Sequence, residues 1–173
     1  MKTQSKIQSI PIELIHLRKN LFDKLNLSLS DFEFEKESRE YEASSFRLNQ
    51  KVVLYRKAKI TPTKSGQFVT LWKRNGKKII EPFQDSDPFD FLIVLAKTEF
   101  NLGIFIFSKS ILIEQGILSI KENEGKRAFR IYAAWDLAEN KQSIKTKKWQ
   151  TEFFLNLSEL EVDLDFAKNL LAV

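Results

Sequence analysis

The sequence predicts an α/β protein in which one compact domain, residues 1–173, has a central mixed β-sheet and flanking helices. A chain of 173 residues suits a single domain of ordinary size. Residues 91–96 and 102–107 are continuous apolar runs, typical of central strands that are buried on both faces. Apolar residues recur at helical spacing near the N-terminus and again after residue 138, which predicts helices beside the sheet.

Composition excludes several kinds of site. The chain has no cysteine and one histidine, His16, so disulfides, thiolate metal sites, cysteine nucleophiles and multi-histidine metal centres are absent. We also find no phosphate-binding glycine loop, no HExxH pair and no EF-hand loop. No apolar run is long enough to span a bilayer, and the N-terminus lacks the apolar core of a secretory signal. We therefore expect a soluble, cytoplasmic protein that does not insert into membranes.

The N-terminal pattern predicts a helix over about residues 11–25. Pro11 suits the first turn of a helix, and Ile12, Ile15, Leu21 and Leu25 follow at near-helical spacing. The acidic stretch 28–40 is expected to be a solvated connection, which leaves room for a short helical turn.

Residues 41–80 form the basic hairpins. A first hairpin pairs strands 41–48 and 51–60 around Asn49-Gln50, which sets Leu48 opposite Lys51 and Glu42 opposite Lys57. We expect Glu42 and Lys57 to form an exposed ion pair that contributes roughly 0.2 to 1 kcal/mol.

A second hairpin joins strands 68–73 and 77–80 around Asn75-Gly76, because both residues tolerate the backbone angles of a tight turn. Between the hairpins, residues 61–64 fit two structures. One is a short helical turn capped by Thr61, whose free backbone N–H groups seat an anion. The other is an ordinary loop with a solvated lysine.

Residues 91–157 supply the central strands and further helices. Ser108 and Gly116 have the positions of an N-cap and a C-terminal glycine around helix 109–115. The remaining expected elements are a strand at 127–133, a helix at 138–157 and a C-terminal segment at 158–173 that ends in an apolar stretch.

Charge is distributed unevenly. The net charge is +5, but the stretch from Ala43 to Ile80 contains no acidic residue and ten basic ones: Arg47, Lys51, Arg56, Lys57, Lys59, Lys64, Lys73, Arg74, Lys77 and Lys78. Such a local excess predicts binding to a polyanion. A second interpretation is that these side chains are a solvated edge that discourages aggregation between strands.

The first functional hypothesis is a non-catalytic protein that binds the backbone of nucleic acid, double-stranded DNA in preference to RNA, with little sequence preference. The residues expected to contact phosphates are Lys57, Lys59, Lys64, Arg74, Arg130, Lys145 and Lys148. This hypothesis requires no cofactor and no metal.

The second hypothesis is a nuclease dependent on Mg²⁺ or Mn²⁺, which needs two or three carboxylates and a lysine on adjacent strands. Glu42, Asp90 from the 85–90 loop, and Lys59 are the candidates. Lys57 stands where the glutamate of a Glu-x-Lys pair is expected, and it puts a positive charge where the metal should bind. This substitution favours the non-catalytic hypothesis.

Four segments resemble the MepB family of small bacterial proteins: FRLNQKVVLYRKAKITPTKSGQFVTLWKR, DPFDF, EGKRAFRIYAAWDL and KTKKWQ. The resemblance extends from about Tyr41 to Phe154. It implies a compact α/β domain similar to the restriction-endonuclease-like fold, without an intact nuclease carboxylate set. The family is named for its genetic association with a multidrug efflux system, which suggests a third hypothesis: an accessory protein that binds a partner or a cationic drug.

Overall fold

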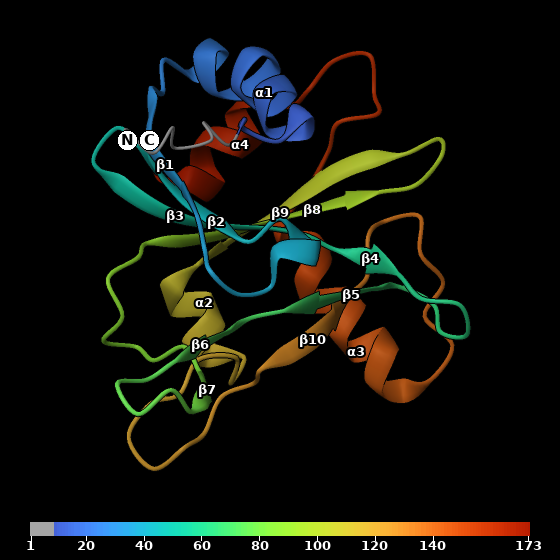
Figure 1. Ribbon diagram of the computed structural model, residues 1–173. Helices are drawn as coiled ribbons and strands as arrows, with labels where there is room; N and C mark the ends of the chain where they lie inside the picture. The colour runs from blue at the N-terminus through green and yellow to red at the C-terminus, as the bar shows by residue number, and fades with distance from the viewer. Residues whose placement is uncertain (1–8) are drawn as a thin grey trace.

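A six-stranded mixed sheet is the centre of the structure, a computed structural model that describes residues 9–173 (Figure 1). Its strand order is β1-β2-β3-β8-β9-β11. The central neighbours β3 and β8 are parallel, and every other neighbouring pair is antiparallel. The strands are β1 (Leu29–Phe34), β2 (Ser44–Leu48), β3 (Lys51–Lys57), β8 (Phe91–Lys97), β9 (Leu102–Ser108) and β11 (Phe154–Asn156).

Two smaller sheets and several helices complete the domain. A three-stranded sheet has the order β10-β5-β4, and β6 pairs with β7 in a separate hairpin. Their strands are β4 (Lys59–Ile60), β5 (Gln67–Thr70), β6 (Trp72–Arg74), β7 (Ile80–Pro82) and β10 (Ala128–Ile131). The helices are α1 (Ile12–Leu17), α2 (Lys109–Glu114), α3 (Lys141–Gln150) and α4 (Leu164–Leu171). The predicted single α/β domain with a mixed sheet is confirmed.

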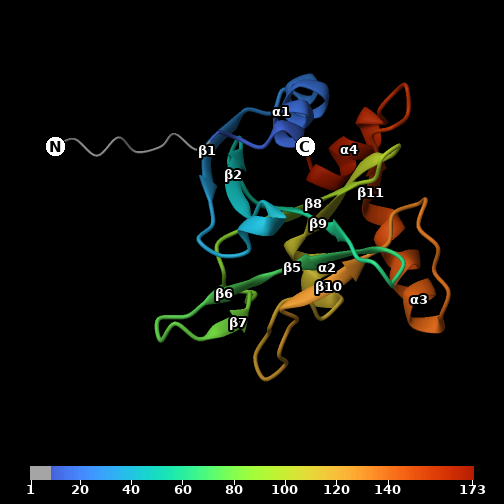
Figure 2. The same cartoon turned by 45° about the vertical axis from the view of Figure 1, so that its right-hand side comes forward.

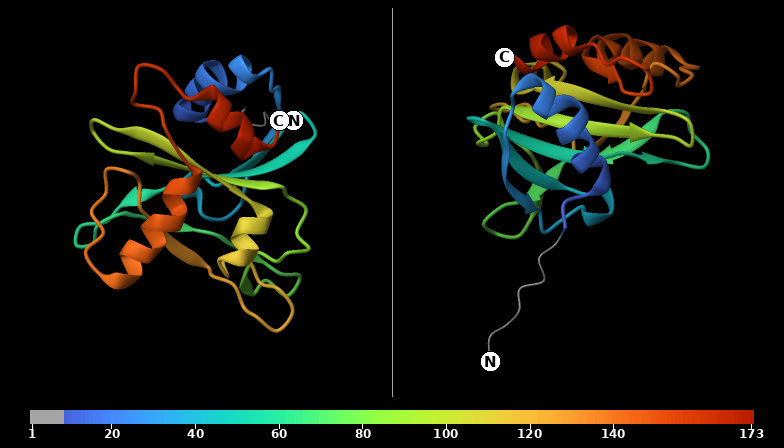
Figure 3. Two further views of the ribbon diagram at one scale, coloured as in Figure 1. Left: turned by 180° about the vertical axis from the view of Figure 1, so that it is seen from behind. Right: turned by 90° about the horizontal axis from the view of Figure 1, so that it is seen from above.

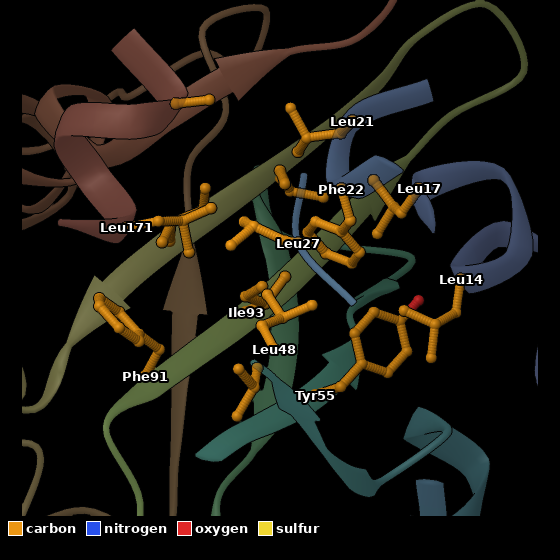
Figure 4. Close-up of a cluster of buried hydrophobic side chains, with 14 of the residues drawn as sticks. Leu14, Leu17, Leu21, Phe22, Leu27, Leu48, Tyr55, Phe91, Ile93 and Leu171 are labelled. Carbon is orange, nitrogen blue, oxygen red and sulfur yellow. The ribbon is translucent and has the colours of Figure 1, made fainter. Parts of the chain in front are cut away.

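One face of the central sheet is covered by the N-terminal helical segment and α4. Helix α1 continues through a π-helical turn η1 (Arg18–Phe22) and a 3-10 turn η2 (Asp23–Leu25), so the residues predicted to be helical are helical. Figure 4 shows Leu14, Leu17 and Phe22 of this segment together with Tyr55 and Ile93 of the sheet. All five are at most 2% exposed, so this layer is a continuous core.

The other face of the central sheet is covered by the small sheet, α2 and α3. Phe105 and Phe107 of β9 are fully buried there, against Val69 of β5 and Leu112 of α2. Figure 3, seen from behind, shows α2 and α3 on the side of the sheet opposite to α1 and α4. Within residues 9–173, no helix has the length and apolar character that crossing a bilayer requires.

The first hairpin has the predicted register. Leu48 pairs with Lys51, and the pairing ends at Ser44 and Tyr55. Both strands are shorter than predicted, because Glu42 has a left-handed φ of 50° and residues 59–60 leave β3 to pair with β5 as β4. Asn49 occupies the turn with a φ of 53°, a left-handed conformation that asparagine tolerates well. The predicted central strands are likewise present as β8 and β9. Ser108 caps α2 by accepting a hydrogen bond from the backbone N–H of Ile111.

The acidic stretch 28–40 is not the expected solvated connection. Its first part is β1, an edge strand that pairs antiparallel with β2 and carries an irregularity between Ser30 and Glu33. Phe32 and Phe34 alternate with acidic residues at the period of two that a half-buried strand requires. The rings pack edge to face at 5.0 Å between centroids. The prediction is wrong because the acidic residues occupy the exposed face of a strand whose other face carries the phenylalanines.

The helix predicted over 138–157 is shorter. Helix α3 covers residues 141–150, a 3-10 turn η4 (Thr151–Phe153) ends it, and Phe154 begins the edge strand β11. Two consecutive phenylalanines, Phe153 and Phe154, fit either a helix or a strand by local pattern. Phe154 is in a strand because it pairs with β9, where it lies opposite Phe105.

The second hairpin and the segment before it also differ from expectation. Asn75-Gly76 begins a five-residue loop, and β6 pairs with β7 at residues 80–82, so residues 77–79 are not a strand. The helical turn at Thr61 does not form, and residues 61–66 are an irregular loop. Gly66, at φ +72°, ends this loop where any Cβ would lie 2.6 Å from the carbonyl oxygen of Ile131.

Candidate nucleic-acid interface

A row of three residues crosses the small sheet. Phe68 of β5 is the register partner of Lys59 on β4 and of Arg130 on β10. Directly opposed residues in antiparallel strands point to the same face, so the two cations flank an aromatic ring with about 10 Å between their Cα atoms. The ring of Tyr41 packs against Phe68 at 6.2 Å, and the Lys59 ammonium lies 4.9 Å from the Tyr41 ring centre.

Arg130 holds the loop between β4 and β5 through hydrogen bonds to its residues. Its guanidinium donates hydrogen bonds to the Thr61 hydroxyl at 2.7 Å and to the carbonyl oxygens of Lys64, Ser65 and Gly66 at 3.0 to 3.2 Å. These acceptors hold the loop in one conformation. Four hydrogen bonds to the loop therefore engage the Arg130 guanidinium, and Arg130 positions this loop.

Lys59 and Lys64 are the cations that this scaffold presents to solvent. Both side chains are exposed, and neither has an acidic partner among residues 9–173. Lys59 stands on the small sheet, and Lys64 stands on the loop that Arg130 fixes. The structure therefore brings together these two of the seven predicted contacts.

Unlike Lys59 and Lys64, Lys57 is paired with carboxylates. Its ammonium lies 2.8 Å from Glu13 on α1 and 3.6 Å from Glu42, and Lys97 at the end of β8 reaches the same Glu13 oxygen at 3.2 Å. The predicted Glu42–Lys57 pair is present. It is half-buried and has a third member, so the prediction of an exposed pair was wrong in that respect.

Burial and charge shift the protonation of this cluster. Burial acts to raise the pKa of Glu13, but hydrogen bonds from Lys57 and Lys97 outweigh it and hold that pKa at about 2. Burial raises the pKa of Glu42, where Lys57 only partly offsets it. Burial also works against the charged form of Lys57, yet its hydrogen bond to Glu13 leaves the pKa of the ammonium raised. The side chains of Glu13 and Lys57 are therefore both charged at neutral pH.

Arg74 and four other cations of the basic stretch are neutralised by acidic residues outside it. Arg74 pairs with Glu37 at 2.7 Å, and Arg56, fully buried, pairs with Glu35 through both terminal nitrogens. The five paired cations are Arg47, Arg56, Lys57, Lys73 and Arg74, and the other five are Lys51, Lys59, Lys64, Lys77 and Lys78. Only half of the predicted positive charge is thus free of partners within residues 9–173.

Lys145 and Lys148 belong to α3, the helix that faces the viewer in the left panel of Figure 3. Both are exposed, and neither forms an ion pair within the described part of the chain. Three residues apart on a helix, they share one face. They form a second basic surface on a different element from Lys59.

The nuclease residues are not assembled. Asp90 accepts a hydrogen bond from the backbone N–H of Val52 at the beginning of β3, whereas Glu42 lies beside Lys57 at its end. Five residues of strand separate the two positions by about 16 Å. Lys59 faces Tyr41. Residues 9–173 contain no group of three acidic or histidine side chains arranged to hold a metal ion, so Mg²⁺ or Mn²⁺ does not fit the proposed set.

Two residues with clear structural roles are not identified by the sequence patterns. Glu13 is 6% exposed on an amphipathic helix, and the signal was a carboxylate on its apolar face. Gln150 is fully buried, accepts a hydrogen bond from the Tyr132 N–H at 2.8 Å and donates one to the Arg130 carbonyl at 2.9 Å. Its side-chain amide therefore bonds to the backbone of β10 as the backbone of a neighbouring strand would. These hydrogen bonds connect α3 to the strand that carries Arg130.

These features define an α/β protein with a mixed central sheet and a basic loop on an accessory sheet. The sequence model of the MepB-like family matches residues 35–156, so the chain belongs to this family. The crystal structure of MepB is similar, with a TM-score of 0.75 and 34% identity over 87% of this chain and 99% of that one. A bacterial homing endonuclease, I-Ssp6803I, has a TM-score of 0.43 and 11% identity over 79% and 84% of the two chains. No curated protein sequence matches this one.

Proposed function

We propose that this protein binds the phosphate backbone of nucleic acid, double-stranded DNA in particular, and does not cleave it. The observation that carries the proposal is the pair of exposed lysines, Lys59 and Lys64, on a sheet and loop held rigid by Arg130. The loop backbone is already ordered, so binding does not have to immobilise it. Backbone contacts of this kind position a duplex without selecting its sequence.

Lys57 supports the non-catalytic part of the proposal. Its ammonium lies 2.8 Å from Glu13 and 3.6 Å from Glu42, so a lysine occupies the place that a divalent ion would take between carboxylates in a hydrolytic site. An ammonium neutralises these carboxylates but does not activate water as a divalent ion does. We therefore expect no cleavage of plasmid DNA with Mg²⁺ or Mn²⁺; cleavage that disappears in Glu42→Ala would contradict this part.

The test is the affinity for a labelled duplex across a salt series, with chelator present. Each phosphate contact contributes roughly 0.9 to the slope of log K against log salt, so Lys59→Ala/Lys64→Ala should lower the slope by about 2 and weaken binding to all sequences equally. Lys19→Ala/Lys24→Ala is the matched control, because these exposed lysines lie on the N-terminal helical turns at the far side of the central sheet.

Two outcomes overturn the proposal. If the wild-type protein does not bind at low salt, the exposed lysines are a solvated edge and not an interface. If the control variant weakens binding as much as Lys59→Ala/Lys64→Ala does, the attraction follows net charge and the loop is not the site.

A further inference from the structure

The tip of the β6–β7 hairpin combines unpaired positive charge with exposed apolar surface. Lys77 and Lys78 are exposed and have no acidic partner among residues 9–173. Ile79 beside them is 58% exposed, and Ile80 is 36% exposed. Figure 2 shows this hairpin projecting from the body of the molecule. A surface of this composition fits an anionic partner with apolar edges.

The tip has a defined conformation because Asn75 organises it. The Asn75 side-chain oxygen accepts hydrogen bonds from the backbone N–H groups of Lys77 at 2.9 Å and Ile79 at 3.1 Å. Arg74 donates to the carbonyl oxygen of Lys78 at 3.0 Å. The two lysines are thus presented from a preorganised loop, as Lys64 is from the loop that Arg130 holds.

The two loops lie at opposite ends of one extended segment. Strand β5 continues through Leu71, whose N–H donates to the Arg127 carbonyl, directly into β6. The nine residue-to-residue steps of extended chain from Gly66 to Asn75 span about 30 Å. Figures 1 and 2 both show the loop after β4 and the β6–β7 tip at the two ends of this segment. B-DNA repeats about every 34 Å, so the two loops are separated by nearly one turn of duplex.

We propose that the β6–β7 tip is a second contact arm for the same nucleic acid duplex, about one helical turn from Lys59 and Lys64. Lys77 and Lys78 contact phosphates, and Ile79 packs against the sugar edge of the groove. This inference rests on the proposed function. Its consequence is that a duplex must be long enough to reach both loops before the tip adds affinity.

The test compares the affinities of Lys77→Ala/Lys78→Ala and the wild type for two duplexes, one of about 8 and one of about 20 base pairs. A separation of about 30 Å corresponds to ~9 base pairs of B-DNA, so the longer duplex can reach both loops and the shorter one cannot. The variant should bind the long duplex about tenfold or more weakly, with a salt slope lower by about 2, and should bind the short duplex as the wild type does. The matched control is again Lys19→Ala/Lys24→Ala, which should leave both affinities unchanged.

The outcomes separate this inference from the proposed function. An unchanged affinity for the long duplex, or an equal loss on both duplexes, overturns the second arm while binding through Lys59 and Lys64 stands. Failure of the wild-type protein to bind either duplex overturns both proposals. Circular dichroism of the Lys77→Ala/Lys78→Ala variant shows whether its fold is intact. Ile79→Ser, which keeps both lysines, is an independent check. It should lower the affinity for the long duplex by a smaller factor and leave the affinity for the short duplex unchanged.

Discussion

Arg56 and Lys64 belong to the same basic stretch, but the fold places them in opposite environments. Arg56 is fully buried and binds Glu35 through two hydrogen bonds of 2.7 and 2.8 Å. Lys64 is exposed, and Arg130 donates a hydrogen bond to its backbone carbonyl; its ammonium has no acidic partner within residues 9–173. The comparison shows that a run of basic residues contains two populations: cations that stabilise the fold and cations that are available to a ligand.

The acidic segments explain this division. Asp31, Glu35 and Glu37 come from the stretch that forms β1 and its continuation, and each pairs with a cation of the hairpins. Asp87 and Glu81 pair with Lys73 in the same way. Half of the positive charge of this stretch is therefore neutralised by folding. Within residues 9–173 its unpaired lysines are Lys51 and Lys59 on strands and Lys64, Lys77 and Lys78 on loops.

The largest effect is expected for Arg56→Met. Arg56 also donates hydrogen bonds to the carbonyl oxygens of Thr70 and Tyr55. Its removal leaves the Glu35 carboxylate without its cation and removes these bonds, which should lower the free energy of unfolding by about 3 to 5 kcal/mol. Urea denaturation measures it. Arg47→Ala is the control, because this exposed arginine is 3.5 Å from Asp31 and its loss should change stability by no more than about 0.5 kcal/mol. Equal losses would show that burial does not separate the two populations.

An intermediate effect on the free energy of unfolding is expected from Glu13 as the pH changes. Its pKa is lowered from 4.5 to about 2, so the carboxylate stabilises the fold above pH 4.5, and this contribution is lost as the pH falls from 4.5 toward 2. The shift corresponds to at most about 3 kcal/mol.

The measurement is the difference in unfolding free energy between the wild type and Glu13→Gln across this pH range. The difference should be greatest above pH 4.5 and shrink toward pH 2. A difference that does not change with pH would mean that Glu13 contributes through packing and not through its charge.

The smallest effect on stability is expected for Lys59→Ala/Lys64→Ala. Exposed side chains without ionic partners contribute little, so the free energy of unfolding should change by less than about 0.5 kcal/mol for each residue. The same denaturation experiment measures this, and it also shows that any loss of DNA affinity in the variant is not a loss of folding. A decrease above about 2 kcal/mol would place these lysines with the structural cations.

Local sequence patterns predicted much of the fold. The continuous apolar runs gave β8 and β9, and Asn49-Gln50 gave the turn that sets Leu48 opposite Lys51. Ser108 was identified as a cap because its role depends only on the residues that follow it. The errors at β1 and β11 fall on edge strands. β1 has a local signal in its alternating phenylalanines, but its acidic composition points the other way, and β11 is fixed by pairing with the distant strand β9. The errors at Thr61 and at the second hairpin fall on loops.

The candidate site was predicted in part. Lys59 and Lys64 were named, and the structure places them together on the small sheet and its loop. Glu13 was missed because it lies 44 residues from Lys57, and no local pattern relates the two. Arg130 was predicted as a phosphate contact, but it reaches back 64 to 69 residues to hold a loop.

By itself the sequence determined the secondary structure of the centre, the register of its first hairpin and the local excess of lysine and arginine, because these depend on neighbouring residues. Only the tertiary structure decided which cations are neutralised and which face solvent. Ion pairs such as Arg74 with Glu37 join residues far apart in the chain. A side chain's charge is set by its type, whereas its availability is set by which acidic groups folding brings within reach.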